Sequence, residues 1–212
     1  AVTTEERAAL NLHLDESLSN EVGSGGLGDA TADDVASTVT VSETPANAQA
    51  IGELSTAAGA LSALFSGLGV QDYGTDGAGS RTDTLSLVLS GASVQTNLVV
   101  TALAGTGLAA LTELERTVSL VQVNANVVEG RIPGTAGSTT DEYVAFRITL
   151  VGGGTPATAT LKVDQFLPID HGADEPSLLD EAQALLLGSG DSLTLRLSTA
   201  VVDGDGDRVT DT

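Results

Sequence analysis

The chain of 212 residues contains no cysteine, which excludes disulfide bonds and thiolate metal sites as supports for its fold. Aromatic residues make up only 2% of the sequence, so a core must be built from aliphatic side chains. Apolar residues still amount to 41%, which is too many for an intrinsically disordered chain. No apolar run is long enough to span a membrane, and no signal peptide is recognisable. We therefore expect a folded domain with an aliphatic core and no membrane insertion.

Basic residues are also scarce, with 8 lysines and arginines against 29 acidic residues and a formal net charge of -21. Proteins bind nucleic acids and anionic membranes through Lys and Arg that displace counterions, so this charge argues against both partners. The charge also makes the chain repel itself, and divalent cations such as Ca²⁺ would relieve the repulsion by binding carboxylate and carbonyl oxygens. Simple solubility explains the charge equally well, so the charge alone does not decide between the two interpretations.

The length of the chain suits one domain. It begins at Ala1, contains no methionine and stops at Thr212 directly after a charged loop, which predicts a segment of a longer polypeptide. No break in pattern marks a second domain. We therefore predict that residues 1–212 form a single module.

Apolar and polar residues alternate in several segments, as they do in strands with one buried and one exposed face. Clusters of Gly, Asp, Ser and Thr lie between these segments, for example Gly74–Ser80 and Gly152–Pro156, and are typical of turns. This arrangement predicts an all-β fold, an antiparallel Ig-like β-sandwich. The predicted strands comprise Leu10–Leu14, Leu85–Leu89, Val144–Leu150, Ala157–Val163 and Leu193–Val201.

Two short stretches have apolar residues at helical spacing. In Glu53–Phe65, the side chains of Leu54, Ala58 and Leu61 fall on one helical face. Ser177–Leu187 has the same spacing and follows a proline, which suits the first turn of a helix. We therefore expect one or two short helices that cover an open end or edge of the sandwich.

The sharpest motif is Asp203-Gly204-Asp205-Gly206-Asp207, which follows the last predicted strand. Alternate carboxylates separated by glycine let the backbone curl so that several oxygens converge, as in many Ca²⁺ loops. The motif is not an EF-hand, because the glutamate at the twelfth position and the flanking helices are missing. It predicts a calcium site formed by Asp203, Asp205 and Asp207. The alternative is an acidic hairpin turn between two strands.

Further acidic residues lie where predicted strands end and turns begin. Each of these turns is by itself more typical of a solvated turn than of a ligand set. Together they supply carboxylates at one end of a sandwich, so we include them as candidate calcium ligands. These residues are Asp15, Glu16, Asp76 and Asp174.

Catalytic motifs are weak. His13 and His171 are the two histidines, and they lie on the outer face of a predicted strand and in an acidic turn. No Gly-x-Ser-x-Gly nucleophile turn is present. Two glycine patterns, at Gly23–Gly28 and Gly105–Ala110, lack the parallel βαβ context that nucleotide binding needs. We therefore predict that the chain is not an enzyme and has no catalytic residues.

As an ordered set, several segments resemble the type I secretion target repeats of giant repeats-in-toxin bacterial adhesins. The similarity covers residues 70–212 well and the N-terminal third loosely, where Leu14–Ser17 is similar to the acidic motif that precedes such repeats. The segments are Tyr73–Ser80 with Leu85–Leu89, Val121–Arg131, Val144–Leu150 with Leu161–Phe166, His171 with the acids that follow it, and Asp203–Asp207.

The resemblance implies tandem β-sandwich modules in very long surface proteins, exported through a one-step channel and rigidified by Ca²⁺ outside the cell. We therefore interpret the chain as a calcium-stabilised spacer that projects ligand-binding regions for attachment and biofilm formation. The resemblance implies a secreted, bacterial cell-surface location and adjacent repeat modules as partners, with the isolated fragment a monomer. The alternative is a carbohydrate- or peptide-binding module of the same adhesin, for which Tyr73 and Tyr143 are the candidate contacts.

Overall fold

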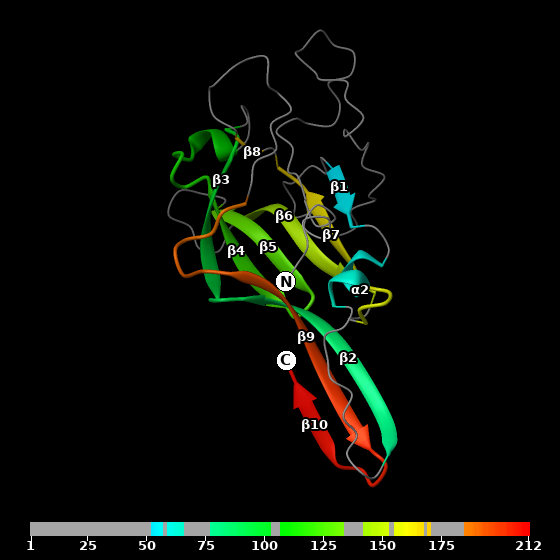
Figure 1. The fold of residues 1–212 in the computed structure, drawn as a ribbon. Coiled ribbons are helices and arrows are strands. Elements are labelled where there is room, and N and C mark those ends of the chain that lie inside the picture. The colour runs from blue at the N-terminus through cyan, green and yellow to red at the C-terminus, as the bar shows by residue number, and fades with distance from the viewer. Residues whose placement is uncertain are drawn as a thin grey trace.

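Antiparallel strands form two sheets in the computed structural model, which describes residues 52–56, 59–65, 77–102, 107–133, 142–152, 155–167, 169–170 and 185–212 (Figure 1). The larger sheet has the strand order β1-β7-β6-β5-β4-β3-β8, and the smaller has the order β10-β9-β2. The larger sheet comprises β1 (Gly52–Ser55), β7 (Thr160–Gln165), β6 (Glu142–Val151), β5 (Val127–Pro133), β4 (Thr117–Asn124), β3 (Ser93–Val100) and β8 (Ile169–Asp170). The smaller sheet comprises β10 (Arg208–Asp211), β9 (Leu193–Asp203) and β2 (Ala78–Leu89).

The aliphatic core lies between the two sheets. In β2, the side chains of Leu85, Leu87 and Leu89 are 1%, 4% and 8% exposed. Each lies opposite a leucine of β9, because the register pairs these positions with residues 197, 195 and 193. The larger sheet contributes fully buried residues such as Leu120 and Val128. The predicted antiparallel Ig-like β-sandwich is therefore confirmed, and burial of aliphatic area provides its main stabilisation.

Four of the predicted strands lie in described residues, and the structure places a strand at each. Leu85–Leu89 is the end of β2, and the stretch 144–150 is the middle of β6. The prediction at 193–201 corresponds to β9. The segment predicted at 157–163 becomes a strand only from Thr160 onward, because the residues before it form a turn. The predicted strand at 10–14 lies outside the described residues.

The predicted helix over residues 53–65 is wrong in its first part. Residues 53–55 belong to β1, which pairs with residues 162–164 of β7. The helix is limited to α2 (Ala60–Leu64), which begins after Gly59 in the left-handed conformation, φ 84°. Leu61 of α2 is completely buried in the core, so the helix does pack against the sandwich. Pairing with a distant strand overrode the local helical spacing.

The second predicted helix, over 177–187, is described only at its last three residues. These are not helical, because Leu187 forms an isolated bridge with Thr96 and Asn97 bonds to the backbone of Leu186. The rest of that prediction lies outside the described residues. Among the described helices, none is long and apolar enough to cross a membrane.

The smaller sheet is longer than the part that covers the core, so its far half projects beyond the larger sheet (Figure 1). We call this half the ribbon; it consists of residues 78–84 of β2, residues 199–203 of β9, and β10. Its side chains include an ion pair between Arg81 and Asp83, 2.9 Å apart, and a hydrogen bond from the Thr199 hydroxyl to the same carboxylate at 2.8 Å. On the face of β2 that carries leucines near the core, the ribbon carries polar side chains. Their contacts join β2 to β9 outside the core.

Candidate metal centre

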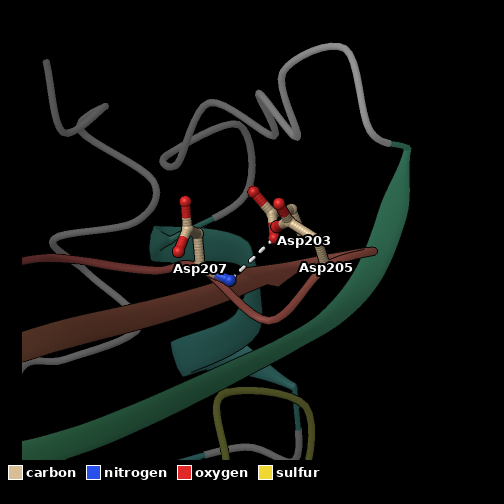
Figure 2. Close-up of side chains that lie close together, drawn as sticks. All are labelled: Asp203, Asp205 and Asp207. Carbon is tan, nitrogen blue, oxygen red and sulfur yellow. Dashed lines mark hydrogen bonds between the residues drawn. The ribbon is translucent and has the colours of Figure 1, made fainter.

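The Asp203–Asp207 motif forms the turn of the β9–β10 hairpin at the tip of the ribbon (Figure 2). Strand β9 ends at Asp203 and β10 begins at Arg208, so four residues make the loop. The Asp203 N–H donates to the Asp207 carbonyl at 3.0 Å and closes the turn. Gly206 has φ 101°, a conformation that side-chain-bearing residues rarely adopt. The motif therefore lies in a hairpin turn between two strands, and the prediction of a calcium site depends on how its carboxylates are placed.

The Asp203 side chain organises the loop from within. Its Oδ1 accepts a hydrogen bond from the N–H of Asp207 at 2.8 Å (Figure 2). It also accepts one from the N–H of Gly206 at 3.1 Å. The pKa of Asp203 lies below its ordinary value of 3.8, chiefly because of a hydrogen bond with the Asp205 side chain. Desolvation opposes this effect, and the backbone amides that donate to Asp203 lower the pKa further. Asp203 is therefore held as a carboxylate close to a second acidic group.

The three carboxylates converge. One oxygen from each of Asp203, Asp205 and Asp207 lies within 4.8 Å of the other two. Two oxygens bound to one Ca²⁺ at 2.3–2.6 Å are at most about 5 Å apart, so this spacing fits a shared calcium ion. Three carboxylates supply up to about six oxygens, and the remaining ligands of a six- to eight-coordinate ion would be carbonyl groups or water. Asp205 and Asp207 are exposed and Asp203 is half-buried, so the site is open to solvent. Exposed acidic clusters also occur without metal, so the geometry permits a calcium site and does not require one.

Gly79 supports the loop from the neighbouring strand. Ala78 lies opposite Asp203 and Ser80 lies opposite Val202, with an irregular register between them. A Cβ atom on Gly79 would lie 2.4 Å from the carbonyl oxygens of both Val202 and Asp203, where no side chain fits. The missing side chain thus lets β2 approach the residue that opens the acidic loop.

The sequence pattern had suggested a different role for Gly79, because residues 74–80 resemble a turn. The turn is described only at Gly77, with φ 83°, and β2 already begins at Ala78. A glycine within a strand often marks a close approach of another backbone segment. Gly79 gave that signal, but the sequence does not show that the approaching backbone is that of Val202 and Asp203.

The other predicted ligands cannot be compared with this site. Asp15, Glu16, Asp76 and Asp174 lie outside the described residues, as do His13 and His171.

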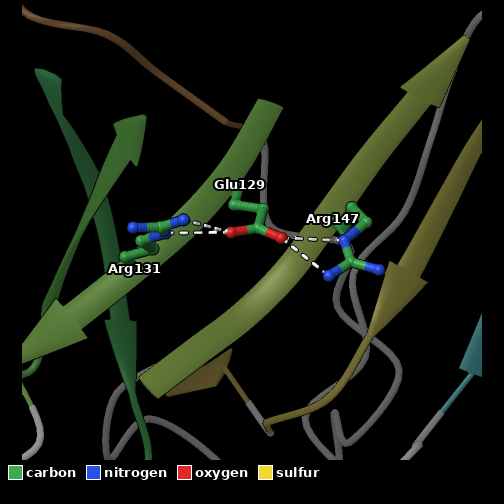
Figure 3. Close-up of polar contacts among 3 residues, drawn as sticks. All are labelled: Glu129, Arg131 and Arg147. Atoms are coloured by element: carbon green, nitrogen blue, oxygen red, sulfur yellow. Dashed lines mark hydrogen bonds and ion pairs between the residues drawn. The ribbon is translucent and has the colours of Figure 1, made fainter. Parts of the chain in front are cut away.

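A second charged cluster lies on the larger sheet, on β5 and β6 (Figure 3). Glu129 is 5% exposed, and its carboxylate lies between two guanidinium groups. Arg131 donates to Oε2 through Nε at 2.9 Å and Nη2 at 2.7 Å, and Arg147 reaches Oε1 through Nε and Nη2, both at 2.8 Å. Arg147 also lies 5.8 Å from the ring centre of Phe166. Both oxygens of Glu129 are therefore engaged, and the cluster is an ion network that joins the two strands.

Sequence reasoning did not find this network. Glu129 and Arg131 are two residues apart, which places them on one face of a strand, and this pattern was a usable signal. The second arginine is 18 residues away in the chain, and only the pairing of β5 with β6 brings it opposite Glu129.

The candidate contacts for a carbohydrate receive no support from the described residues. Tyr143 is 9% exposed and belongs to the core, so its ring cannot stack against a sugar at the surface. Tyr73 lies outside the described residues. The glycine pattern at 105–110 is described from Gly107, where a four-residue 3-10 helix, η1 (Gly107–Ala110), replaces the long helix that a nucleotide-binding unit needs.

Fold and site together define an antiparallel β-sandwich domain with a projecting ribbon and an acidic hairpin at its tip. A family model described as "Domain of unknown function (DUF5801)" matches residues 38–212, and the chain belongs to this family. No curated protein and no solved structure matches the chain.

Proposed function

We propose that the chain is a calcium-stabilised structural spacer module of a large secreted adhesin on the bacterial cell surface. The observation that carries the proposal is the convergence of the Asp203, Asp205 and Asp207 carboxylates at the tip of the ribbon. The resemblance to repeats-in-toxin adhesin repeats supplies the adhesin context. The alternative, a carbohydrate- or peptide-binding module, is less well supported, because Tyr143, one of its two candidate contacts, is buried.

Calcium acts on the hairpin by neutralising charge. Three carboxylates within 4.8 Å repel one another when all are ionised. A bound Ca²⁺ replaces this repulsion with attraction and links the end of β9 to the start of β10. The folded hairpin binds the ion better than the unfolded chain, so binding stabilises the fold. In a chain without cysteine, metal then takes the place that disulfides hold in other extracellular domains.

The shape and the charge of the chain together support the proposed spacer role. The ribbon extends the sandwich in one direction (Figure 1). A chain with net charge -21 stays soluble and resists self-association, as suits a module displayed in many copies outside a cell. Its partners are then the adjacent modules of the same polypeptide, and attachment and biofilm formation are activities of the parent protein.

Thermal unfolding with Ca²⁺, with Mg²⁺ and with a chelator tests the calcium claim. At a Ca²⁺ concentration about 100 times Kd, a single site adds about 2.7 kcal/mol of stability. For a chain of this size, each kcal/mol raises Tm by about 2–4 °C, so we expect an increase of about 5–11 °C. Equal molar Mg²⁺ controls for general screening of charge and should have a smaller effect. A midpoint that is the same with Ca²⁺ and with chelator would overturn the claim.

Variants locate the site. Asp205→Asn removes one of the three charges and keeps a side-chain amide that can still hydrogen-bond Asp203, so the apo protein should keep its Tm or gain slightly from reduced repulsion. The variant should lose most of the calcium-dependent increase. Glu113→Gln is the matched control, because Glu113 is also an exposed acidic residue in a turn and lies far from the hairpin in the sequence. If both variants keep the full increase, the calcium ion binds elsewhere in the chain.

The spacer claim needs a separate observation. The parent gene should encode further copies of this module, each with an acidic motif like Asp203–Asp207 at a regular interval. A parent protein with a single copy and no repeats would contradict the spacer role even if calcium binds.

A further inference from the structure

Strand β2, at one edge of the smaller sheet, is hydrogen-bonded to strand β4 of the larger sheet through the side chain of Gln122. Gln122 of β4 accepts a hydrogen bond from the N–H of Leu89 through Oε1 at 2.8 Å and donates from Nε2 to the carbonyl of Leu87 at 3.3 Å. One residue of a parallel neighbouring strand would bond in the same way, since it accepts from residue i+1 and donates to residue i−1. The Gln122 amide thus replaces a strand residue beside β2.

The turn after β4 adds to this contact. The Leu87 N–H donates to the carbonyl of Ala125 at 2.7 Å, and Gln122 Nε2 also donates to the carbonyl of Asn124. The bond to Asn124 holds the Gln122 amide in the orientation in which it can bond β2. Two neighbouring residues of β2 that face the core are therefore bonded to the larger sheet through their backbones.

The segment that leads into β9 is also hydrogen-bonded to the larger sheet. The Leu186 N–H donates to Oδ1 of Asn97 at 2.7 Å, and the Asn97 N–H donates to the carbonyl of Leu186 at 3.1 Å. Between the two contacts, Ser90 joins the end of β2 to the start of β9, because its N–H donates to the Ser192 carbonyl at 2.9 Å. Strand β2 and the segment that leads into β9 are thus both hydrogen-bonded to the larger sheet.

We propose that the hydrogen bonds of Gln122 to β2 fix the direction in which the ribbon projects. Apolar contacts between two sheets are non-directional and tolerate small rotations. Hydrogen bonds weaken steeply when their angles change, so bonds from Gln122 to two backbone groups of β2 permit one angle between the sheets. Because β2 continues from Leu87 back to the start of the ribbon, an angle set at Leu87 and Leu89 is transmitted to the acidic hairpin at the tip. The inference concerns the fold and holds whether or not the chain is a calcium-dependent spacer.

Gln122→Met tests the role of these hydrogen bonds, because methionine has a similar length and offers no strong donor or acceptor. Amide hydrogen exchange in the full chain reports the result. We expect exchange at Leu89 and Leu87 to accelerate about tenfold or more, since one amide loses its acceptor and the other loses a supporting bond. Gln95→Met is the matched control, because Gln95 is an exposed glutamine on the adjacent strand β3.

The direction of the ribbon is measured by double electron–electron resonance between spin labels at Thr82→Cys and Ala157→Cys. Both positions are exposed, and the absence of native cysteine makes the labelling specific. We expect one narrow distance distribution in the parent and in Gln95→Met, and a broader one in Gln122→Met. If Gln122→Met does not fold, Gln122→Glu replaces it, since the carboxylate keeps the bond from Leu89 and loses the one to Leu87. Parent-like exchange and parent-like distances in the folded variant would overturn the proposal, with or without calcium present.

Discussion

Replacing Gly79 with alanine adds a methyl group where the structure has no room for one. The new Cβ would lie 2.4 Å from the carbonyl oxygens of Val202 and Asp203 and 2.8 Å from the carbonyl carbon of Asp203. Carbon and oxygen atoms in close strand contacts are about 3.3–3.6 Å apart, so β2 and β9 must separate locally by about 1 Å. All the crowded atoms belong to backbone, so no side-chain rotation relieves the clash.

The cost follows from the ladder that this separation disrupts. One or two backbone hydrogen bonds are lost or lengthened, each with a net value of about 0.5–1.5 kcal/mol, so we expect Gly79→Ala to destabilise the fold by about 1–3 kcal/mol. For a chain of this size, Tm falls by about 2–12 °C. The Asp203 carboxylate should also lose its position, so the amides of Gly206 and Asp207 exchange faster.

Gly91→Ala is the matched control for this experiment. A Cβ on Gly91 has its nearest neighbour at 3.6 Å, an ordinary contact, and its backbone is not in the left-handed region. Alanine there should be neutral, or stabilising by about 0.4–1 kcal/mol because the unfolded chain loses freedom. Urea unfolding and hydrogen exchange measure both variants. A Gly79→Ala protein as stable as Gly91→Ala, with unchanged exchange at Gly206 and Asp207, would refute the steric argument.

Two further predictions concern the charged networks. Glu129→Ala removes the buried carboxylate that bonds both Arg131 and Arg147, and we expect the free energy of unfolding in urea to fall by about 2–4 kcal/mol. Glu113→Ala at the surface should change it by no more than about 0.5 kcal/mol. Similar losses in both variants would show that the network is unimportant. The pKa of Asp83 is lowered from 3.8, chiefly by its hydrogen bond with Arg81, so its contribution to stability is fully present above pH 3.8 and is lost as the pH falls through the lower folded-state value. Asp83→Asn should therefore flatten the fall in unfolding free energy below about pH 4, and an unchanged slope would contradict this.

The positions of the strands were largely predictable. Alternation with a period of two is a local property, and at Leu85–Leu89 it identified both the strand and its buried face. The acidic loop was predictable for the same reason, because five consecutive residues contain its carboxylates and its glycines. The local pattern failed where a distant partner decided the outcome. Residues 53–55 have helical spacing, yet pairing with β7 makes them a strand.

The candidate site was only partly predictable. Asp203, Asp205 and Asp207 were found from spacing alone, and the structure brings their oxygens together. Gly79 was not found, because its importance depends on carbonyl groups more than 120 positions later in the chain. Tyr143 was a candidate contact at the surface, but the sandwich buries it.

Composition and local pattern were enough to predict the aliphatic core, the alternating faces of the strands, the strong negative charge and the grouping of three carboxylates in one loop. These are properties of composition and of neighbours along the chain. The tertiary structure decided which strands pair, where Glu129 meets its second arginine, how Gln122 joins the two sheets, and that the acidic loop lies at the tip of a projecting ribbon. The physical reason is that each of these depends on contacts between residues far apart in the chain, which no local pattern specifies.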